Sequence, residues 1–309
     1  MFTYFINDLA DVISVAVPEK FVDDTNLAYF DHPSNLDNLV KSIESELVIV
    51  NDWVIQNSLV LNTDKTKMIV IATPRKLRSI GNLDIMFNNM LIQQCENLKC
   101  LGLNIDNTLS WKTHIDKIAK VCQARICSLY KIRDFIPDKY KLVLGHALVL
   151  SLVNYMSTIW SSTTNSNIKV MEKVLRSLAR FITGKRKYDS VAPIICHELK
   201  WLFPKELGNY NMLCIMFKLD KCLPIDYFKD YFVLRGQTHT YPTSLATSDN
   251  LSFNYNPNSN YGYATFHFRA IELWNSLPSD VKQCTTLFMF KKKLKSHLLD
   301  LQVNRLNIH

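Results

Sequence analysis

Apolar side chains in the first third of the chain occur in short runs separated by polar residues. Runs of this length that are rich in β-branched and aromatic residues are typical of strands. They lie at residues 2–5, 27–30, 68–72, 83–87, 90–92 and 98–105. The Asn88-Asn89 pair between two of these runs predicts a hairpin turn. Residues 1–110 are therefore expected to contain several short strands.

One longer stretch in this part has the spacing of a helix. Between residues 36 and 57, apolar side chains recur every three or four positions, which places them on one helical face. They are Leu36, Leu39, Val40, Ile43, Leu47, Val50 and Val54. Ser34 followed three residues later by Asp37 is a typical helix start, so the sequence predicts one helix among the strands.

Helical spacing dominates residues 111–232. One apolar stripe occupies residues 115–130, and another occupies residues 168–182 and closes at Gly184, a residue type that favours helix ends. Further helices are expected around Trp201 and Met212. The sequence thus predicts a mostly helical region after the strands.

Residues 142–160 form an apolar stretch without any Asp, Glu, Lys or Arg. Its length approaches that of a membrane span, but Gly145, His146, Asn154 and other polar residues would be costly against lipid. We interpret the stretch as a buried core helix, and no membrane partner is expected.

The last part of the chain changes character twice. Residues 233–260 are rich in Thr, Ser, Asn and Pro and lack periodic apolar positions, which predicts a loop or linker. Residues 261–309 contain a dense aromatic run and then a short basic helix at 288–299. The whole pattern predicts an α+β protein with strands in residues 1–110, helices in 111–232 and a small C-terminal module.

The charge of the chain favours polyanionic partners. Of 309 residues, 36 are Lys or Arg and 28 are Asp or Glu, so the net charge is +8. Lys and Arg displace counterions from a phosphate backbone, which makes nucleic acid a candidate partner. Only 7 glycines are present, and no Gly-rich phosphate loop occurs among them.

The eight cysteines form no C-x-x-C pair. Cys95 and Cys100, like Cys122 and Cys127, are separated by four residues, so a zinc site made from them would be irregular. Cys122 lies on an apolar stripe, where a free thiol packs as a small apolar group. We expect reduced cysteines in an intracellular protein, without a choice between nucleus and cytoplasm.

Paired carboxylates at Asp23 and Asp24 lie between two predicted strands. Taken alone, such a pair is either a polar turn or part of a metal site. Its sequence context favours the second interpretation.

Several segments, in this order, resemble the palm of LINE-type (non-LTR retrotransposon) reverse transcriptases. They are residues 2–9 (FTYFINDL), 21–30 (FVDDTNLAYF), 59–71 (LVLNTDKTKMIVI) and 100–114 (CLGLNIDNTLSWKTH). Residues 261–298, which contain LWNSLP at 273–278, resemble the C-terminal end of jockey- and CR1-type elements. The resemblance covers most of the chain.

The resemblance implies a partial palm, a thumb-like helical region, and an RNA-directed DNA polymerase acting on RNA template, DNA primer and dNTPs. Asp23 would be a direct Mg²⁺ ligand and Asp24 a ligand or support, since phosphodiester synthesis uses two cations. Lys65 would lie near the leaving phosphates, or it is an ordinary solvated turn lysine. Leu101 and Gly102 would form the primer-grip hairpin.

Parts of the family pattern are missing before Asp23. The resemblance implies a further palm aspartate and a fingers domain, and the 22 residues before Asp23 contain neither. The isolated chain is therefore expected to be inactive as a polymerase. The alternatives are a non-catalytic nucleic-acid-binding module and a fragment without function.

Two basic clusters are candidates for phosphate contact. Lys185, Arg186 and Lys187 follow a predicted helix end, and Lys291, Lys292, Lys293 and Lys295 lie in the last predicted helix. Each cluster is either a nucleic-acid contact or a solvated basic surface. Phe266, Phe268 and Trp274 either stack on bases or form a small core.

Overall fold

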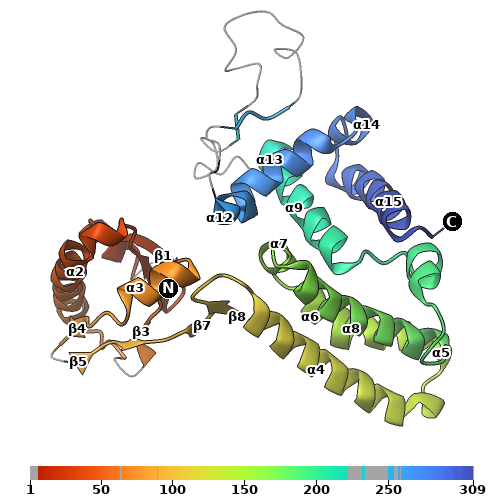
Figure 1. The fold of residues 1–309 in the computed structure, drawn as a ribbon, viewed down its shortest axis with the longest axis horizontal. Helices are drawn as coiled ribbons and strands as arrows, with labels where there is room; N and C mark the ends of the chain where they lie inside the picture. Colours follow the sequence, from red (N-terminus) through yellow and green to blue (C-terminus); the bar gives the residue numbers. More distant parts are fainter. Residues whose placement is uncertain are drawn as a thin grey trace, which may run out of the picture. The chain divides into compact units, whose positions relative to one another are not determined.

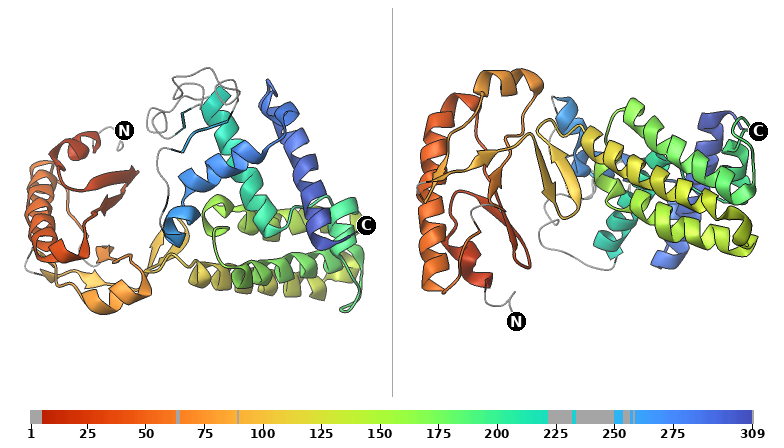
Figure 2. Two further views of the ribbon diagram at one scale, coloured as in Figure 1. Left: turned by 45° about the horizontal axis from the view of Figure 1, so that its top comes forward. Right: turned by 90° about the horizontal axis from the view of Figure 1, so that it is seen from below.

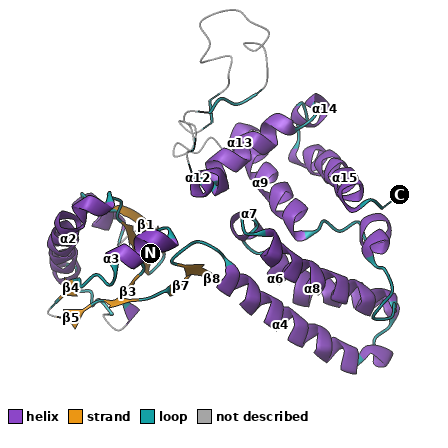
Figure 3. Ribbon diagram, viewed as in Figure 1, coloured by secondary structure: helices purple, strands orange, loops and turns teal. Residues whose placement is uncertain are grey.

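The computed structural model describes residues 6–62, 65–88, 90–221, 232–233, 250–253, 257 and 259–308. The chain divides into two compact units, Met1–Ser110 and Trp111–His309. Helices predominate, and every described strand lies in the first unit (Figure 3). The predicted α+β class is confirmed.

Within the described residues, the first unit starts with a short helix and a hairpin, and the strand expected at residues 2–5 lies outside them. The 3-10 helix η1 (Asn7–Val12) precedes strand β1 (Val17–Phe21), which pairs antiparallel with β2 (Asp24–Ala28). Helix α2 (Leu36–Gln56) follows (Figure 1). The residues that form a common apolar core are Ile6, Leu9, Val50, Trp53 and Val54.

Helix α2 has the predicted span, but it does not start at Ser34 as expected. A single 3-10 turn, η2 (Pro33–Asn35), comes first, and the backbone N–H of Ser34 donates to the ring of His32. Asn35 is the N-cap of α2 and makes no capping hydrogen bond with its side chain. The proline-led turn therefore displaces the helix start by one residue.

Strands in the rest of the first unit are shorter than predicted. Strand β3 (Lys67–Met68) pairs parallel with β6 (Gln93–Gln94), and β4 (Met86–Phe87) pairs antiparallel with β5 (Met90–Leu91). The expected strand at 68–72 is therefore wrong beyond Met68. A second helix follows, which the sequence analysis missed, so the prediction of a single helix in this unit is also wrong.

This second helix is α3 (Pro74–Ile80). Its start is specified locally, because the Thr73 hydroxyl accepts from the N–H of Lys76 and Pro74 occupies the first helical turn. Gly81, at φ 70°, ends it.

The expected strand at residues 98–105 is two strands joined by a turn, at the position where the resemblance implies a hairpin. Strand β7 (Asn97–Cys100) reverses into β8 (Leu103–Asp106), and the two pair antiparallel. Leu101 and Gly102 form the turn, with φ of 44° and 85°. Positive φ at both central positions suits the twist of a two-residue hairpin.

The second unit is built on two long helices that lie side by side, α4 (Lys112–Lys131) and α8 (Asn165–Thr183) (Figures 1 and 2). Both match the predicted stripes, and α8 ends at Gly184 with φ 72° as expected. The rings of Tyr130 and Phe181 meet edge to face at 5.3 Å. Since each ring lies near the C-terminal end of its helix, α4 and α8 run in the same direction.

Residues 142–160 do not form the single buried helix that we expected. The stretch contains α5 (Asp138–Gly145), the π-helix η5 (His146–Leu150), α6 (Ser151–Asn154) and α7 (Ser157–Trp160). Met156 breaks it at φ 51°. Val143 is 61% exposed, whereas Val149 and Trp160 are buried. Some apolar side chains of this stretch are therefore buried and others are exposed. In the described part of the chain, no helix is long and apolar enough to cross a membrane.

A second core of this unit forms around α9 (Pro204–Lys221). The helices α12 (Asn260–Ala264), α13 (Phe266–Ser276), α14 (Ser279–Lys282) and α15 (Leu287–Leu306) follow in sequence. Phe217 of α9 stacks on Phe290 of α15 at 4.4 Å. Helix α15 ends at Leu306, past the predicted end at residue 299.

Two expectations near this core need correction. Trp201 lies in a loop after the π-helix η6 (Ile194–Glu198), not in a helix. Leu251, from the segment expected to be a linker, is buried in the same core, and the N–H of Ser252 donates to the carbonyl of Val233. Residues 234–249 of that segment lie outside the described residues.

Polar groups near the C-terminal end of α15 join it to the start of α9. The fully buried amide of Gln302 accepts from the N–H of Phe203 at 2.6 Å and donates to the carbonyl of Trp201 at 3.0 Å. Arg305 pairs with the buried carboxylate of Glu206 at 2.9 Å and 3.1 Å. Burial raises the pKa of Glu206, and Arg305 opposes that rise.

Candidate functional site

The carboxylates of Asp23 and Asp24 lie at the tip of the β1–β2 hairpin. Val22 and Asp23 form its turn, and Asp24 pairs with Phe21. Both carboxylates are exposed. Val22 has φ 58°, a conformation that costs a β-branched residue about 1–3 kcal/mol. The hairpin therefore presents the two carboxylates to solvent on a strained turn.

This pair supplies only part of a metal site. Mg²⁺ takes six oxygen ligands, often a few carboxylates with water and substrate phosphates. Within the described residues, no three His, Cys, Asp or Glu side chains come close enough together to hold a metal ion. Asp23 and Asp24 fit one cation in part, and by themselves they do not make a two-cation centre.

Two of the sequence motifs are neighbours in the first unit. The side-chain amide of Asn26, two residues after Asp24, donates to the sulfur of Cys100 at 3.5 Å. Cys100 directly precedes the Leu101-Gly102 turn. The structure therefore brings the acidic hairpin beside the hairpin that contains this turn.

Lys65 is exposed, and it follows a turn organised by Asn62. The backbone N–H of Lys65 donates to the Asn62 carbonyl and side-chain oxygen, both at 3.1 Å. Among the described residues, its ammonium group forms no ion pair. The neighbouring residues 63 and 64 lie outside the described part.

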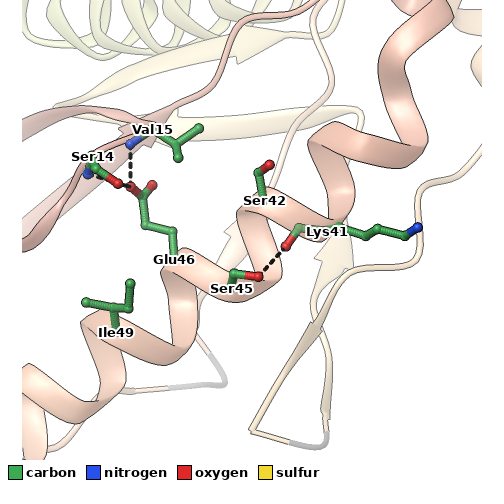
Figure 4. A pocket seen from close by; sticks show the side chains of 7 residues that line it. All are labelled: Ser14, Val15, Lys41, Ser42, Ser45, Glu46 and Ile49. Atoms are coloured by element: carbon green, nitrogen blue, oxygen red, sulfur yellow. Dashed lines mark hydrogen bonds between the residues drawn. The ribbon is translucent and has the colours of Figure 1, made fainter.

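Glu46, which was not among the predicted site residues, positions the acidic hairpin. This carboxylate is 2% exposed and accepts from the backbone N–H groups of Ser14 and Val15 at 2.7 and 2.6 Å (Figure 4) and from that of Ala16 at 3.0 Å. Burial pushes its pKa up, but hydrogen-bond donors, chiefly these three N–H groups with a smaller contribution from Tyr29, outweigh burial and hold the pKa below its ordinary value. The segment leading into β1 is thereby fixed to α2.

A sequence signal for Glu46 did exist. It lies three residues after Ile43 and four before Val50, on the stripe that α2 buries. A carboxylate at such a position is expected to have a partner. It also borders a small open pocket, together with Ser14, Val15, Lys41, Ser42, Ser45 and Ile49.

Charge is divided sharply between the units. Residues 1–110 contain 8 Lys or Arg and 14 Asp or Glu, which gives a net charge of −6. Residues 111–309 contain 28 and 14, which gives +14. The overall +8 therefore understates the basicity of the helical unit, and the acidic unit opposes phosphate binding.

The cluster of Lys185, Arg186 and Lys187 is exposed just beyond α8. Within the described part of the chain, none of these three side chains pairs with a carboxylate. The Asp189 carboxylate accepts from the backbone N–H of Arg186 at 2.8 Å, which orders the loop while leaving the cations in solvent.

The lysines of α15 are not equivalent. Lys291, Lys292 and Lys295 are exposed. Lys293 is instead engaged by α14, because its ammonium group donates to the Asp280 carbonyl at 2.9 Å and pairs with the Asp280 carboxylate at 3.3 Å. Three cations of this cluster therefore remain as candidates for phosphate contact.

The aromatic residues of α13 pack against rings from other segments of the helical unit. Trp274 is buried and stacks on Phe290 at 6.1 Å, and Phe268 lies 4.8 Å from Phe253. These contacts favour the small-core interpretation of the aromatic run over base stacking.

The described cysteines are free thiols. Burial raises the pKa of Cys122 to about 11 and also raises that of Cys214. Both thiols are therefore protonated at neutral pH and pack as small apolar groups.

No family model matches this chain, and neither a curated protein nor a solved structure matches it significantly.

Proposed function

We propose that the chain is a remnant of an RNA-directed DNA polymerase of the non-LTR retrotransposon type whose helical unit binds nucleic acid. The observation that supports binding most directly is the charge division, −6 in residues 1–110 and +14 in residues 111–309. Affinity would come mainly from phosphate contacts and would depend little on sequence.

The polymerase ancestry rests on the order of the motifs and on the adjacency of two of them. A partial palm would hold Asp23 and Asp24 as Mg²⁺ ligands, with Lys65 and the Leu101-Gly102 turn nearby. Mg²⁺, when bound in the intact family enzyme, activates the primer hydroxyl and stabilises the leaving pyrophosphate. In this chain, Asp23 and Asp24 supply only two carboxylate groups at an exposed turn.

A second candidate function is nucleic-acid binding without catalysis. The partial ligand set at Asp23 and Asp24 favours it. Primer extension on an RNA template with Mg²⁺ or Mn²⁺ separates the two, and we expect no extension by the purified chain. Extension that disappears in Asp23→Asn would reverse this expectation.

The binding proposal is tested by the salt dependence of affinity. Anisotropy of a labelled 20-mer is followed from about 50 to 300 mM KCl, where each phosphate contact contributes about one unit to the logarithmic slope. The triple variants K185Q/R186Q/K187Q and K291Q/K292Q/K295Q should each weaken binding and flatten the slope, and Lys293 is kept because it pairs with Asp280.

A matched control removes three charges from the acidic unit. Arg75, Lys76 and Arg78 are exposed on α3, so R75Q/K76Q/R78Q lowers the net charge by the same amount as each helical triple variant. If the helical unit makes the contacts, this control leaves the slope unchanged. Equal flattening by control and test variants, or no binding at low salt, contradicts the proposal.

A further inference from the structure

The C-terminal ends of α4 and α8 bring two segments together, residues 131–140 and 184–189. The guanidinium carbon of Arg133 lies 6.0 Å from the centre of the Tyr130 ring, which itself contacts Phe181 of α8. A Cβ atom placed on Gly184 would lie 3.0 Å from Arg133 Nη2. Arg133 therefore reaches from the end of one helix to the end of the other.

The segment after α8 is ordered by a second arginine. Arg180 Nη2 donates to the carbonyl of Asp189 at 3.2 Å, and the Asp189 carboxylate accepts from the N–H of Arg186. These bonds fold residues 184–189 back onto the end of α8. The backbone of the loop therefore has a defined course, which begins beside Arg133 at Gly184.

Aromatic rings in these two segments are unusually exposed. In the described part of the helical unit, the three most exposed aromatic side chains are Tyr188 at 90%, Phe135 at 86% and Phe288 at 76%. Single exposed apolar residues need no explanation. Tyr188 and Phe288, however, each lie within three residues of an exposed cation of the clusters already described, and Phe135 lies two residues after the half-buried Arg133 and four residues from the exposed Lys131 and Lys139.

The cations around Phe135 and Tyr188 outnumber the carboxylates available to neutralise them. Arg133, Lys185, Arg186 and Lys187 lie in the two segments, and the Lys187 ammonium lies 5.4 Å from the centre of the Tyr188 ring. The carboxylates of these segments belong to Asp134, Asp138 and Asp189. The Asp138 carboxylate pairs with Lys141 at 2.7 Å, and the Asp189 carboxylate accepts a hydrogen bond from the backbone N–H of Arg186. The surface is positive and bears flat apolar faces.

Single-stranded nucleic acid matches this chemistry better than a duplex does. Unpaired bases stack on exposed aromatic rings while cations contact the backbone phosphates. A duplex keeps its base faces inside and offers mainly phosphates and groove edges. Exposed rings would therefore add affinity for a single strand and little for a duplex.

The geometry points to a single-strand binding patch formed by Arg133, Phe135, Lys185, Arg186, Lys187 and Tyr188, in which Phe135 and Tyr188 stack on bases. This assignment rests on the proposed nucleic-acid-binding function and specifies the form of nucleic acid at this site. Sequence preference is expected to be weak, because every base has a stacking face.

The test compares a 20-nucleotide single strand, as RNA and as DNA, with a 20-base-pair duplex, using the full chain and anisotropy. Stacking contributes about 1–3 kcal/mol per base, which corresponds to roughly 5- to 150-fold in Kd. F135A/Y188A should raise the single-strand Kd at least about fivefold and leave the duplex Kd and the salt slope unchanged. Y188F, which keeps the ring, should bind like the unmodified chain.

Controls distinguish this inference from the function on which it rests. Y261A removes a ring that is 38% exposed and lies in α12, and it should have no effect. Circular dichroism should show unchanged folding of F135A/Y188A, since both rings are exposed. Unchanged single-strand affinity in that variant, or an equal loss for the duplex, overturns the patch but not nucleic-acid binding.

Two further outcomes also decide the matter. Failure of the unmodified chain to bind any nucleic acid overturns both proposals. Anionic lipid vesicles provide the remaining arm, because cations with exposed rings also suit a membrane surface. Vesicle binding that depends on Phe135 and Tyr188, with single-strand affinity unaffected, assigns the patch to lipid and overturns the inference.

Discussion

The two units of this chain differ in how they bury apolar side chains. In residues 1–110 the described strands form only two-stranded sheets, and Phe21, Val22 and Phe30 are 60%, 49% and 79% exposed. In the helical unit, large rings such as Phe181, Phe217 and Phe290 are fully buried. The helical unit thus has a core of its own, whereas the first unit leaves much apolar surface uncovered.

This difference predicts unequal stability. An isolated two-stranded sheet is marginal in water, and exposed strand edges and apolar faces promote association. The first unit therefore depends on individual polar contacts, such as those of Glu46, more than on packing. The helical unit depends on packing, and each large core side chain contributes strongly.

The largest expected effect is in the helical core. Phe217→Ala removes a fully buried ring stacked on Phe290 and should cost about 3–5 kcal/mol. Hydrogen exchange followed by mass spectrometry reports the units separately, and protection should fall in α9 and α15 alone. Leu301→Ala, at an exposed position, should change stability by less than about 0.5 kcal/mol. An equal loss of protection in residues 6–110 would contradict independent units.

The next effect concerns the polar contact that the first unit depends on. Glu46→Gln removes a charged acceptor from three N–H groups and should destabilise that unit by roughly 1.5–3 kcal/mol. Glu19→Gln, on exposed β1, provides the control.

The pH dependence of this contact has a definite sign. The pKa of Glu46 is lower in the folded chain than in the unfolded chain. Its contribution is therefore complete above the unfolded pKa and is lost as pH falls through the folded pKa. Chemical denaturation between about pH 3 and 6 should show this slope in the unmodified chain, and Glu46→Gln should reduce it. If Glu46→Gln keeps the same dependence of unfolding free energy on pH, the loss of stability in acid comes from other carboxylates.

The smallest effect concerns strain at the acidic hairpin, and it has the opposite sign. Val22→Gly relieves a cost of about 1–3 kcal/mol at φ 58° and adds about 0.5–1 kcal/mol of backbone entropy cost. We expect a net gain of about 1 kcal/mol in the first unit, measured by urea unfolding. Val17→Gly, within β1, should destabilise instead. A loss of stability in both variants would show that the turn is not strained.

Locally specified elements were predictable from the sequence. The span of α8 and its end at Gly184 follow from one apolar stripe and one residue that tolerates positive φ. The start of α3 had equally local signals at Thr73 and Pro74, but the adjacent β-branched run obscured them. The turn at Leu101 was not visible from periodicity, because leucine seldom adopts positive φ.

Features that depend on distant segments were not predictable. Absence of charge in residues 142–160 suggested burial, but the packing of neighbours decides which faces are covered, and Val143 remains exposed. The partners of Glu46 are backbone groups some thirty residues earlier, which no side-chain pattern records. Arg133 comes beside Gly184 only because α4 and α8 run in the same direction.

The contacts of Gln302 and Arg305 impose an order of events on synthesis. The N–H of Phe203 receives its acceptor from a residue 99 positions later in the chain. At about 5–20 residues per second, a ribosome needs roughly 5–20 s to cover that distance. During this interval the Phe203 N–H and the Glu206 carboxylate lack their partners Gln302 and Arg305. The apolar face of α9 that packs on α15 is then open to chaperones. The core around α9 is therefore completed only after α15 has been synthesised.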